Sequence, residues 1–283
     1  MRERLPYASV RAFYGTGGVV SAGRSNPAYE ARSYRAGMGA GRFRPFELEV
    51  GETDLWLGFD AESARNLPTS SVQNEVGKLV RRLRNEIIAY SEQCPSFLTS
   101  HTPIQAIVMP DGTVLPELIQ TMLAAGRLAD VGPMAAVAGA IAEAVGRYCK
   151  ERWKLAEVVV ENGGDLYVDV ASPLSVQVVA PSSPLSGKAA IRVVPEICPV
   201  GVCTSSGTVG HSYSYGKADA MMIVCKNAAL ADAWATACCN RIQRQSDIQD
   251  VCEQIREVGD IVAAVIVVTD KIGLCGSLEV CAV

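Results

Sequence analysis

The amino-acid sequence predicts an α+β fold, in which helices and strands occupy different parts of the chain. Of its 283 residues, 49% are hydrophobic and 20% are charged, which is typical of a globular protein that buries a sizeable core. Segments with apolar residues at helical spacing concentrate in the first half, and short apolar runs bounded by Gly, Pro and Ser concentrate in the second. Because the two kinds of segment do not alternate, a doubly wound parallel sheet is disfavoured.

The beginning of the chain is expected to hold a flexible arm and a hairpin. Residues 1–40 are rich in Arg, Gly, Ser and Tyr and show neither a helical nor a strand period, so we expect a flexible N-terminal arm. Residues 41–283 are expected to form a single domain. At its start, residues 42–50 and 52–60 alternate between apolar and polar positions, which predicts an early β-hairpin.

Three helices are predicted before the middle of the chain. Residues 70–93 carry an apolar stripe at helical spacing, and Pro95 ends that helix. Residues 116–129 begin with a proline, which suits a first helical turn. Residues 134–152 follow a Gly-Pro pair and are small and apolar almost all round, as expected of a helix packed closely on several sides.

The second half is expected to supply most of the strands. The predicted strands are 155–160, 165–170, 174–180, 189–194, 217–225 and 261–269, the predicted helices are 227–242 and 246–257, and a last segment spans 271–282.

Charge and cysteine content exclude several classes of protein. A net charge of −4 offers no electrostatic footprint for nucleic acid or an anionic membrane, and no run approaches the ~18 apolar residues of a membrane span.

The N-terminus lacks the apolar run of a secretory signal, so we expect a cytoplasmic protein with its ten cysteines reduced and mostly buried. Neither Cys198 with Cys203 nor the adjacent Cys238 and Cys239 match the spacing of a zinc site.

The start of the third helix is a candidate phosphate site. In DVGPMAA (130–136), the first-turn amides of Met134, Ala135 and Ala136 are expected to be free, and the positive end of a helix dipole attracts phosphate. The alternative is a buried helix with Asp130 near its start, and this stretch taken alone favours that alternative.

The stretch ENGGDLYVD (161–169) is a candidate nucleotide contact. Gly163 and Gly164, which follow Asn162, permit a positive φ or a close approach of backbone to a ligand. Asp165 could then hold a ribose hydroxyl or a ring nitrogen. An ordinary Asn-Gly hairpin turn explains the same residues equally well.

The hydroxyl-rich stretch CTSSGTVGHSYSYG (203–216) is expected to be a loop that binds an oxyanion through amides and hydroxyls. His211 within it is a candidate ligand contact or proton donor. No GxSxG elbow surrounds the serines, which disfavours a serine hydrolase. The expected ligand contacts are Thr204, Ser205, Ser206, Gly207 and Thr208.

A fourth stretch, ADAWATA (231–237), places a carboxylate and a hydroxyl four residues apart. On a helix, Asp232 and Thr236 face the same way and could share one hard cation, which prefers oxygen ligands. Alternatively, Thr236 bonds the carbonyl one turn earlier while Asp232 caps or meets solvent.

Together and in this order, these stretches resemble the ApbE-like superfamily, named for the FAD:protein FMN transferases. The sequence is most similar to a prokaryotic branch of this superfamily that is distinct from the transferases themselves. The similarity covers about residues 33–245. The resemblance implies an ApbE-like, T-fold-like α+β fold with mixed sheets and packed helices. The motifs that carry it are GPMAAVAGAIAE (132–143), VENGGDLY (160–167), CTSSGTVGHSYSYGKADA (203–220) and ADAWATA (231–237).

The resemblance also implies a site. It places Gly163, Gly164 and Asp165 beside a flavin nucleotide. In the family, a Thr-Ser-Gly segment is followed by a histidine, to which the hydroxyl-rich stretch and His211 are similar. It implies that Mg2+ is held next to the pyrophosphate by Asp232, Thr236 and a backbone carbonyl, for which Ala135 is the nearest counterpart. The chain departs from the transferases at Ala136, where they carry a lysine.

The implied function is binding of FAD or another flavin nucleotide with Mg2+, with activity as an FMN transferase or FAD pyrophosphatase and an acceptor flavoprotein as partner. His211 and Asp165 are the catalytic candidates. Two alternatives stay open: a non-catalytic binder of a flavin or other cofactor, and a homo-oligomeric protein with a vestigial site.

Overall fold

The computed structural model describes residues 35, 38–39, 41–107, 112, 114–208 and 214–282. All of the helices and strands discussed below belong to one compact unit, Gly39–Val283. The predicted N-terminal arm, residues 1–40, lies almost entirely outside the described residues.

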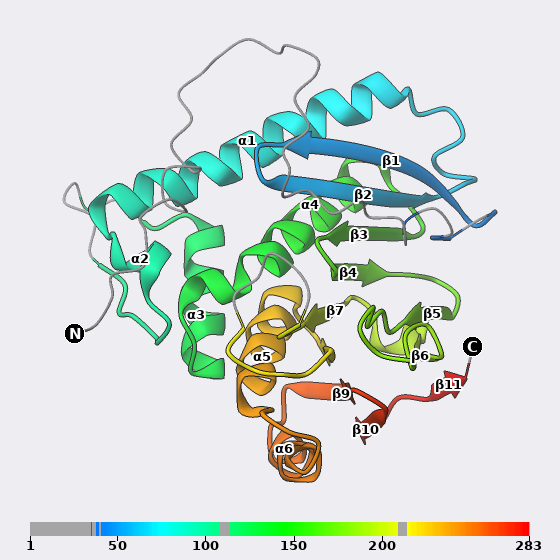
Figure 1. Cartoon of the computed structure of the whole chain (residues 1–283). Coiled ribbons are helices and arrows are strands. Elements are labelled where there is room, and N and C mark those ends of the chain that lie inside the picture. Colours follow the sequence, from blue (N-terminus) through cyan, green and yellow to red (C-terminus); the bar gives the residue numbers. More distant parts are fainter. Residues whose placement is uncertain are drawn as a thin grey trace. The chain divides into compact units, whose positions relative to one another are not determined.

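An eight-stranded sheet forms the centre of this unit (Figure 1). Every pairing between neighbouring strands in it is antiparallel, and its strands follow one another in chain order. A separate three-stranded antiparallel sheet takes two strands from the chain between the fourth and fifth strands of the large sheet, and its third strand follows the last strand of the large sheet. The large sheet contains β1 (Phe43–Val50), β2 (Thr53–Asp60), β3 (Val158–Asn162), β4 (Asp165–Asp169), β7 (Val200–Ser205), β8 (Ala220–Cys225), β9 (Ile261–Val268) and β10 (Lys271–Gly276), and the small sheet contains β11 (Val280–Ala282), β6 (Ala189–Val193) and β5 (Leu174–Gln177).

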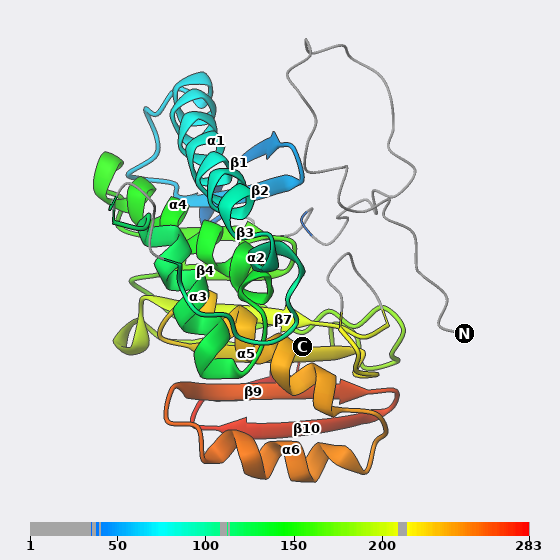
Figure 2. The same cartoon turned by 90° about the vertical axis from the view of Figure 1, so that its left-hand side faces the viewer.

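The main helices gather on one face of the large sheet, which is turned toward the viewer in Figure 2. They are α1 (Thr69–Gln93), α3 (Glu117–Ala129), α4 (Val137–Trp153), α5 (Ala228–Arg241) and α6 (Asp247–Arg256), with a short α2 (Ser96–Thr99) and two 3-10 turns, η3 (Pro133–Ala136) and η4 (Pro195–Ile197). Helix α1 packs on β1, α4 on β3 and β4, α5 on β7 and β8, and α6 on β9 and β10.

Strand alternation turns the chemistry-bearing side chains toward the helices. Tyr167 of β4 lies under Gly146 of α4, where an added Cβ would sit 2.2 Å from the ring. Gly201 of β7 likewise lies against the backbone of α5. Because strand residues two apart share a face, Asp165 and Ser205 also point toward α4 and α5.

The α+β class and the early hairpin are confirmed, as are the main helices. One prediction was wrong: residues 203–216 are not a loop throughout. Residues 203–205 complete β7, which is paired on both sides in the interior of the large sheet. The last predicted segment, 271–282, divides into two strands that join different sheets.

Two further sequence expectations concern membranes and thiols. Among the described residues, no single helix has the length and apolar character needed to cross a membrane; α3 and the η3–α4 segment meet those criteria jointly but are bent by 106°. All ten cysteines are free, and all but Cys198 and Cys281 are buried. The thiols therefore pack as small hydrophobes, as expected.

Candidate functional site

Helices α4 and α5 cap each other with buried carboxylates. Asp232 Oδ2 in α5 accepts a hydrogen bond from the Gly139 amide in the first turn of α4, at 2.9 Å. In return, Glu143 Oε2 in α4 accepts from the Ala228 amide at the start of α5, at 2.7 Å. The positive end of the α4 dipole, proposed from the sequence as a phosphate site, is thus already met by a carboxylate of the protein.

A second carboxylate from the sheet faces this junction. Asp165, the first residue of β4, accepts a hydrogen bond from the Thr204 amide of β7 at 3.2 Å. Asp165 is 5% exposed and Asp232 is 7% exposed. We refer to these two residues as the carboxylate pair.

Both members of the carboxylate pair are shifted toward their neutral forms. Burial raises the pKa of the Asp165 carboxyl well above its usual range, and the nearby charge of Asp232 raises it further. Burial also raises the pKa of the Asp232 carboxyl, against the lowering effect of the α4 amides. Among the described residues, no lysine or arginine forms an ion pair with either carboxylate, so their charge has no fixed counter-ion.

Three polar residues form a stripe along α5. Asp232, Thr236 and Asn240 are four residues apart, so they share one side of the helix. Thr236 Oγ1 lies 3.1 Å from Ser205 Oγ at the end of β7, and Asn240 Oδ1 accepts from the Tyr215 amide at 2.8 Å. Asp232 is buried, whereas Thr236 and Asn240 are half-buried, so the site opens toward the C-terminal end of α5.

The paired glycines of the second stretch make a hairpin turn. Gly163 and Gly164 join β3 to β4 with φ values of 70° and 99°, a conformation that favours glycine. A Cβ added at Gly164 would still lie 4.0 Å from the Thr204 carbonyl oxygen, so a close approach is not what requires glycine. The turn nevertheless lies beside β7, and Asn162 donates to the Ala138 carbonyl of α4 at 3.1 Å.

Of the backbone amides in the first stretch that were predicted to bind phosphate, at least one already donates a hydrogen bond within the protein. Met134, Ala135 and Ala136 form η3 rather than the first turn of α4. The Ala135 amide donates to the Gly132 carbonyl, so the expectation of three free amides was wrong for this residue. Met134 and Ala135 are half-buried, and η3 packs against α5, which keeps the Ala135 carbonyl a candidate ligand.

The third stretch divides into a buried and an exposed part. Ser206 and Thr208 form a turn, and Thr208 Oγ1 also donates to Asp219 Oδ1 at 3.0 Å, so this hydroxyl has a structural partner. A Cβ on Gly207 would meet the Gly216 carbonyl at 1.8 Å, so the two ends of the segment touch there. His211 lies outside the described residues.

Cys203, which precedes the hydroxyls, is packed. Its Sγ lies 3.3 Å from the Ala228 carbonyl oxygen. Burial first, and then the charges of Asp165 and Asp232, raise the pKa of this thiol well above its usual value. Burial therefore favours the neutral thiol over the nucleophilic thiolate.

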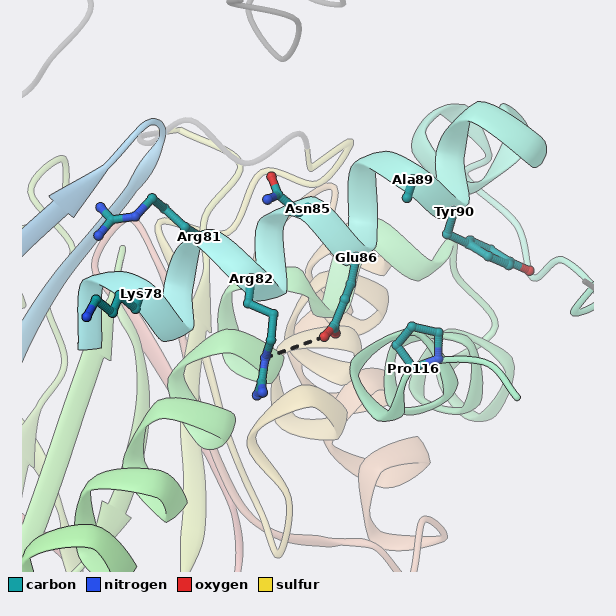
Figure 3. A pocket seen from close by; sticks show the side chains of 8 residues that line it. All are labelled: Lys78, Arg81, Arg82, Asn85, Glu86, Ala89, Tyr90 and Pro116. Atoms are coloured by element: carbon teal, nitrogen blue, oxygen red, sulfur yellow. Dashed lines mark ion pairs between the residues drawn. The ribbon is translucent and has the colours of Figure 1, made fainter. Parts of the chain in front are cut away.

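Two surface grooves lie away from the predicted site residues. One, of about 540 Å³, runs along α1 and is lined by cationic and amide side chains with Tyr90 and Pro116 (Figure 3). In it, the Arg82 guanidinium pairs with Glu86 at 3.7 Å. The other, of about 620 Å³, lies beside α3. Neither contains a residue of the predicted site.

The donors that converge suit a hard cation. No group of three His, Cys, Asp or Glu side chains able to hold a metal occurs within the described part of the chain. The site instead offers two carboxylates and the hydroxyls of Ser205 and Thr236, and oxygen donors of this kind are what Mg2+ prefers.

The site also contains residues that the sequence interpretation missed. Asn240 was detectable, since it continues the four-residue spacing of Asp232 and Thr236. Gly139 and Glu143 were not, because their roles depend on how α4 and α5 meet.

Comparisons with known proteins cover most of the chain. It is 36% identical over 206 residues to the UPF0280 protein of Methanocaldococcus jannaschii, which covers 71% of this chain and 81% of that protein. It is 35% identical over 234 residues to the UPF0280 protein of Methanopyrus kandleri, which covers 80% and 88%.

Two solved structures share the fold. The flavin transferase ApbE from Vibrio cholerae superposes with a TM-score of 0.50 at 12% identity, covering 85% of this chain and 97% of that chain. The apo Pseudomonas stutzeri flavinyl transferase ApbE gives a TM-score of 0.50 at 15% identity, covering 83% and 94%. At these identities the likeness confirms the ApbE-like fold and nothing finer.

A family model extends the match along the chain. The model described as "AbpE bacteria" matches residues 35–273, which includes strand β9 and the first residues of β10 as well as the four stretches.

Proposed function

Because the chain belongs to the family described as AbpE bacteria, we propose that it binds a flavin nucleotide together with Mg2+ at the carboxylate pair. The observation that carries this proposal is the pair itself. Asp165 and Asp232 are buried close together, and among the described residues no cationic side chain pairs with either. Two such carboxylates need either protons or a bound cation.

The proposed cation ligands come from two elements. Asp232 and the Thr236 hydroxyl would bind from α5, and the Ala135 carbonyl would bind from η3, which packs on α5. Asp232 accepts from the α4 amides, with Oδ2 bonded to the Gly139 amide, and the proposal assigns the ion to Oδ1. A Mg2+ ion bound there would supply charge neutralisation at a pyrophosphate.

Binding of the nucleotide would fall to the half-buried rim around the pair. The Gly163–Gly164 turn, Thr204 and Ser206 form the part of that rim contributed by the sheet. With FAD as substrate, the proposed reaction breaks the pyrophosphate bond, releases AMP, and passes the FMN portion to water or to a threonine of an acceptor protein. Asp165 and His211 remain the proposed proton-transfer groups.

A second candidate function is binding without catalysis. Ala136 stands where the resemblance leads us to expect a lysine, so a fixed positive charge is missing from the phosphate side. Charge-assisted contacts of that kind contribute roughly 1.5–3 kcal/mol each. A site without one can keep its ligand and lose the reaction.

The test is release of AMP from FAD by the purified protein with Mg2+. We expect AMP to form with the wild-type chain and to be abolished in Asp232→Asn, which keeps the size of the side chain and removes its charge. Asp250→Asn, on the exposed part of α6, is the matched control and is expected to behave as wild type.

The outcomes separate the two candidates. Flavin bound without AMP release supports the non-catalytic binder. If neither the flavin nor Mg2+ binds by calorimetry, the proposed function is wrong.

A further inference from the structure

We propose that Cys252 and Cys275 form a redox-active thiol pair, which a hydroperoxide converts to a disulfide that joins α6 to β10. Neither residue belongs to the proposed flavin site, so the inference does not depend on the proposed function. It is carried by the faces of α6 and β10 that meet, by the contact between the two thiols, and by how close the thiols lie to the surface.

One face of β10 is covered by α6, which lies alongside β9 and β10 in Figure 2. Gly273 and Cys275 are the two buried residues of this strand. A Cβ added at Gly273 would lie 2.3 Å from Ile248 Cγ2 and 3.3 Å from Cys252 Sγ, and both of these side chains belong to α6. Because strand residues two apart share a face, Cys275 faces α6 as well.

The missing side chain at Gly273 lets the Cys252 sulfur lie close to the strand. Cys252 follows Ile248 by four residues, so both side chains lie on the same side of α6 and contact the same position of β10. The helix and the strand therefore hold the two sulfurs on facing surfaces.

The two thiols contact each other directly. The Cys275 thiol donates a hydrogen bond to Cys252 Sγ, and this bond is the largest cause that lowers the pKa of Cys252 from 9.0 to about 7. The charge of Arg256, one turn later on α6, lowers this pKa further, whereas burial and the charge of Glu253 oppose the shift. The pKa of Cys275 is raised by the same hydrogen bond. Cys252 is therefore the sulfur that supplies a thiolate near neutral pH.

The pair lies just beneath the surface. Cys252 is 6% exposed and Cys275 is 8% exposed, which admits a small oxidant but not a protein thiol. A thiol of lowered pKa beside a second thiol that can resolve its oxidised form is the arrangement found in redox sensors.

The reaction balances with a hydroperoxide as the oxidant. The Cys252 thiolate attacks the outer oxygen, the O–O bond breaks, and the departing oxygen takes a proton, which leaves a sulfenic acid on Cys252. The Cys275 sulfur then attacks Cys252 Sγ. The S–S bond forms, the S–O bond breaks, and hydroxide leaves as water with the Cys275 proton. The two thiols lose two electrons in all, and the peroxide gains them.

The disulfide would close a loop over residues 252–275, which contains β9. Since α6 already packs on β9 and β10, the bond would reinforce an existing contact. A cross-link of this kind stabilises a protein mainly by restricting the unfolded chain. Oxidation would therefore hold α6 on the sheet, and a dithiol reductant would release it.

The experiment treats the reduced, folded full-length chain with hydrogen peroxide. The remaining thiols are blocked with N-ethylmaleimide in denaturant, cross-linked peptides are mapped by mass spectrometry, and the melting temperature is measured. The variants are Cys252→Ser and Cys275→Ser. Cys94→Ser is the matched control, because Cys94 is 7% exposed and its Sγ lies 3.3 Å from the Ser96 hydroxyl instead of from a thiol.

We expect one cross-linked peptide that contains Cys252 and Cys275, and a rise in melting temperature of about 5–10 °C that dithiothreitol reverses. Both effects are expected to be absent in Cys252→Ser and in Cys275→Ser and to be kept in Cys94→Ser. The yield is expected to be independent of protein concentration, because both sulfurs belong to one chain.

Three results would overturn the pair. One is a wild-type chain that gains oxygen at Cys252 without forming the cross-link, and another is a cross-link that joins either residue to Cys238. The third is a cross-link that forms only when the peroxide is added in denaturant. All three are measured on the wild-type chain, so they apply even if a serine variant does not fold. Release of AMP from FAD is a separate measurement, so the two proposals fail independently.

Discussion

At the scale of single residues, Asp232 has two roles that compete. One oxygen completes the hydrogen bonding of the α4 amides, and the other is proposed to bind the cation beside Asp165. An ionised carboxylate at a helix N-terminus is stabilising, but a second buried carboxylate nearby is not. The metal-free protein therefore holds this region at a cost in stability, which the proposed cation would remove.

The Asp232→Asn variant is predicted to separate these roles. Burial raises the pKa of Asp232 above its ordinary value of 3.8, so above that pH the folded state binds more protons than the unfolded state. The stability that Asp232 contributes to the metal-free protein therefore falls as pH rises from about 3.8 to about 7 and stays low above that. At pH 8 without metal, we expect the Asn variant to melt about 2–4 °C higher, because an unpaired buried charge is gone.

The same variant is expected to lose any gain in melting temperature on adding Mg2+. Thermal unfolding at pH 8, with and without Mg2+, measures both effects, and Asp250→Asn serves as control. A metal-free Asn variant that melts well below wild type would show that the capping role dominates.

At the scale of elements, the contact between α4 and α5 sets the geometry of the site. Gly139 is required there, since a Cβ would lie 2.2 Å from the Ala228 carbonyl oxygen and 2.9 Å from the Asp232 Cβ. Both of these atoms belong to α5, and the carbonyl oxygen is part of its backbone. The steric clash can therefore be removed only if the two helices move apart. Separation would also break the two reciprocal carboxylate caps.

Gly139→Ala is accordingly predicted to destabilise the fold by about 1–3 kcal/mol, which lowers the melting temperature by roughly 3–10 °C. The same substitution at Gly259, whose Cβ would meet nothing within 4 Å, is the matched control. Calorimetry of the two variants measures the difference. Equal melting temperatures would contradict the close approach.

A second junction joins the residues just before β1 and β3 to the residues just after β4. Arg42 Nη2 pairs with Glu157 Oε1 at 2.7 Å, and the same oxygen accepts from the amides of Ala171 and Ser172. The Arg42 hydrogen bond is the largest cause that lowers the pKa of Glu157 from 4.5 to about 2. This pair is shielded from solvent mainly on the glutamate side.

The pH dependence of stability follows from that shift. Since the folded pKa is depressed, the stabilisation is complete above about pH 4.5 and is lost as pH falls toward 2. We expect Arg42→Met to lower the melting temperature at pH 6 and to flatten the decline between pH 4.5 and 2. The exposed pair of Arg152 with Glu75 provides the control, because Arg152→Met removes an ion pair open to solvent. Identical acid profiles for the two variants would contradict this account.

At the scale of the whole molecule, the sequence pattern predicted the elements better than their meeting points. Hydrophobic periodicity, and the Gly, Pro and Ser residues that bound the apolar segments, located the hairpin, the long helices and most strands, because those signals are local. The last three residues of β7 (203–205) were predicted to be part of a loop, since Thr204 and Ser205 carry hydroxyls, which occur in turns as well as in strands. Their pairing with β8 depends on residues farther along the chain.

The convergence of the four stretches followed from resemblance rather than from local pattern. Spacing alone placed Asp232 and Thr236 on one helix face, which the stripe agrees with. It could not show that the cap of α4 comes from α5, or that Ala135 turns in a 3-10 helix with its amide committed. Contacts of this kind depend on tertiary packing that no window of sequence contains.

The stripe on α5 has a consequence for how this chain can vary. Its three polar residues form hydrogen bonds with three separate segments. They can do so because their spacing of four residues is close to one turn of an α-helix, which keeps them on one side of α5. Inserting a single residue between Asp232 and Thr236 would rotate everything after it by about 100° and detach two of the three segments at once. Substitutions can adjust this site gradually, whereas a change of length inside α5 would dismantle it in one step.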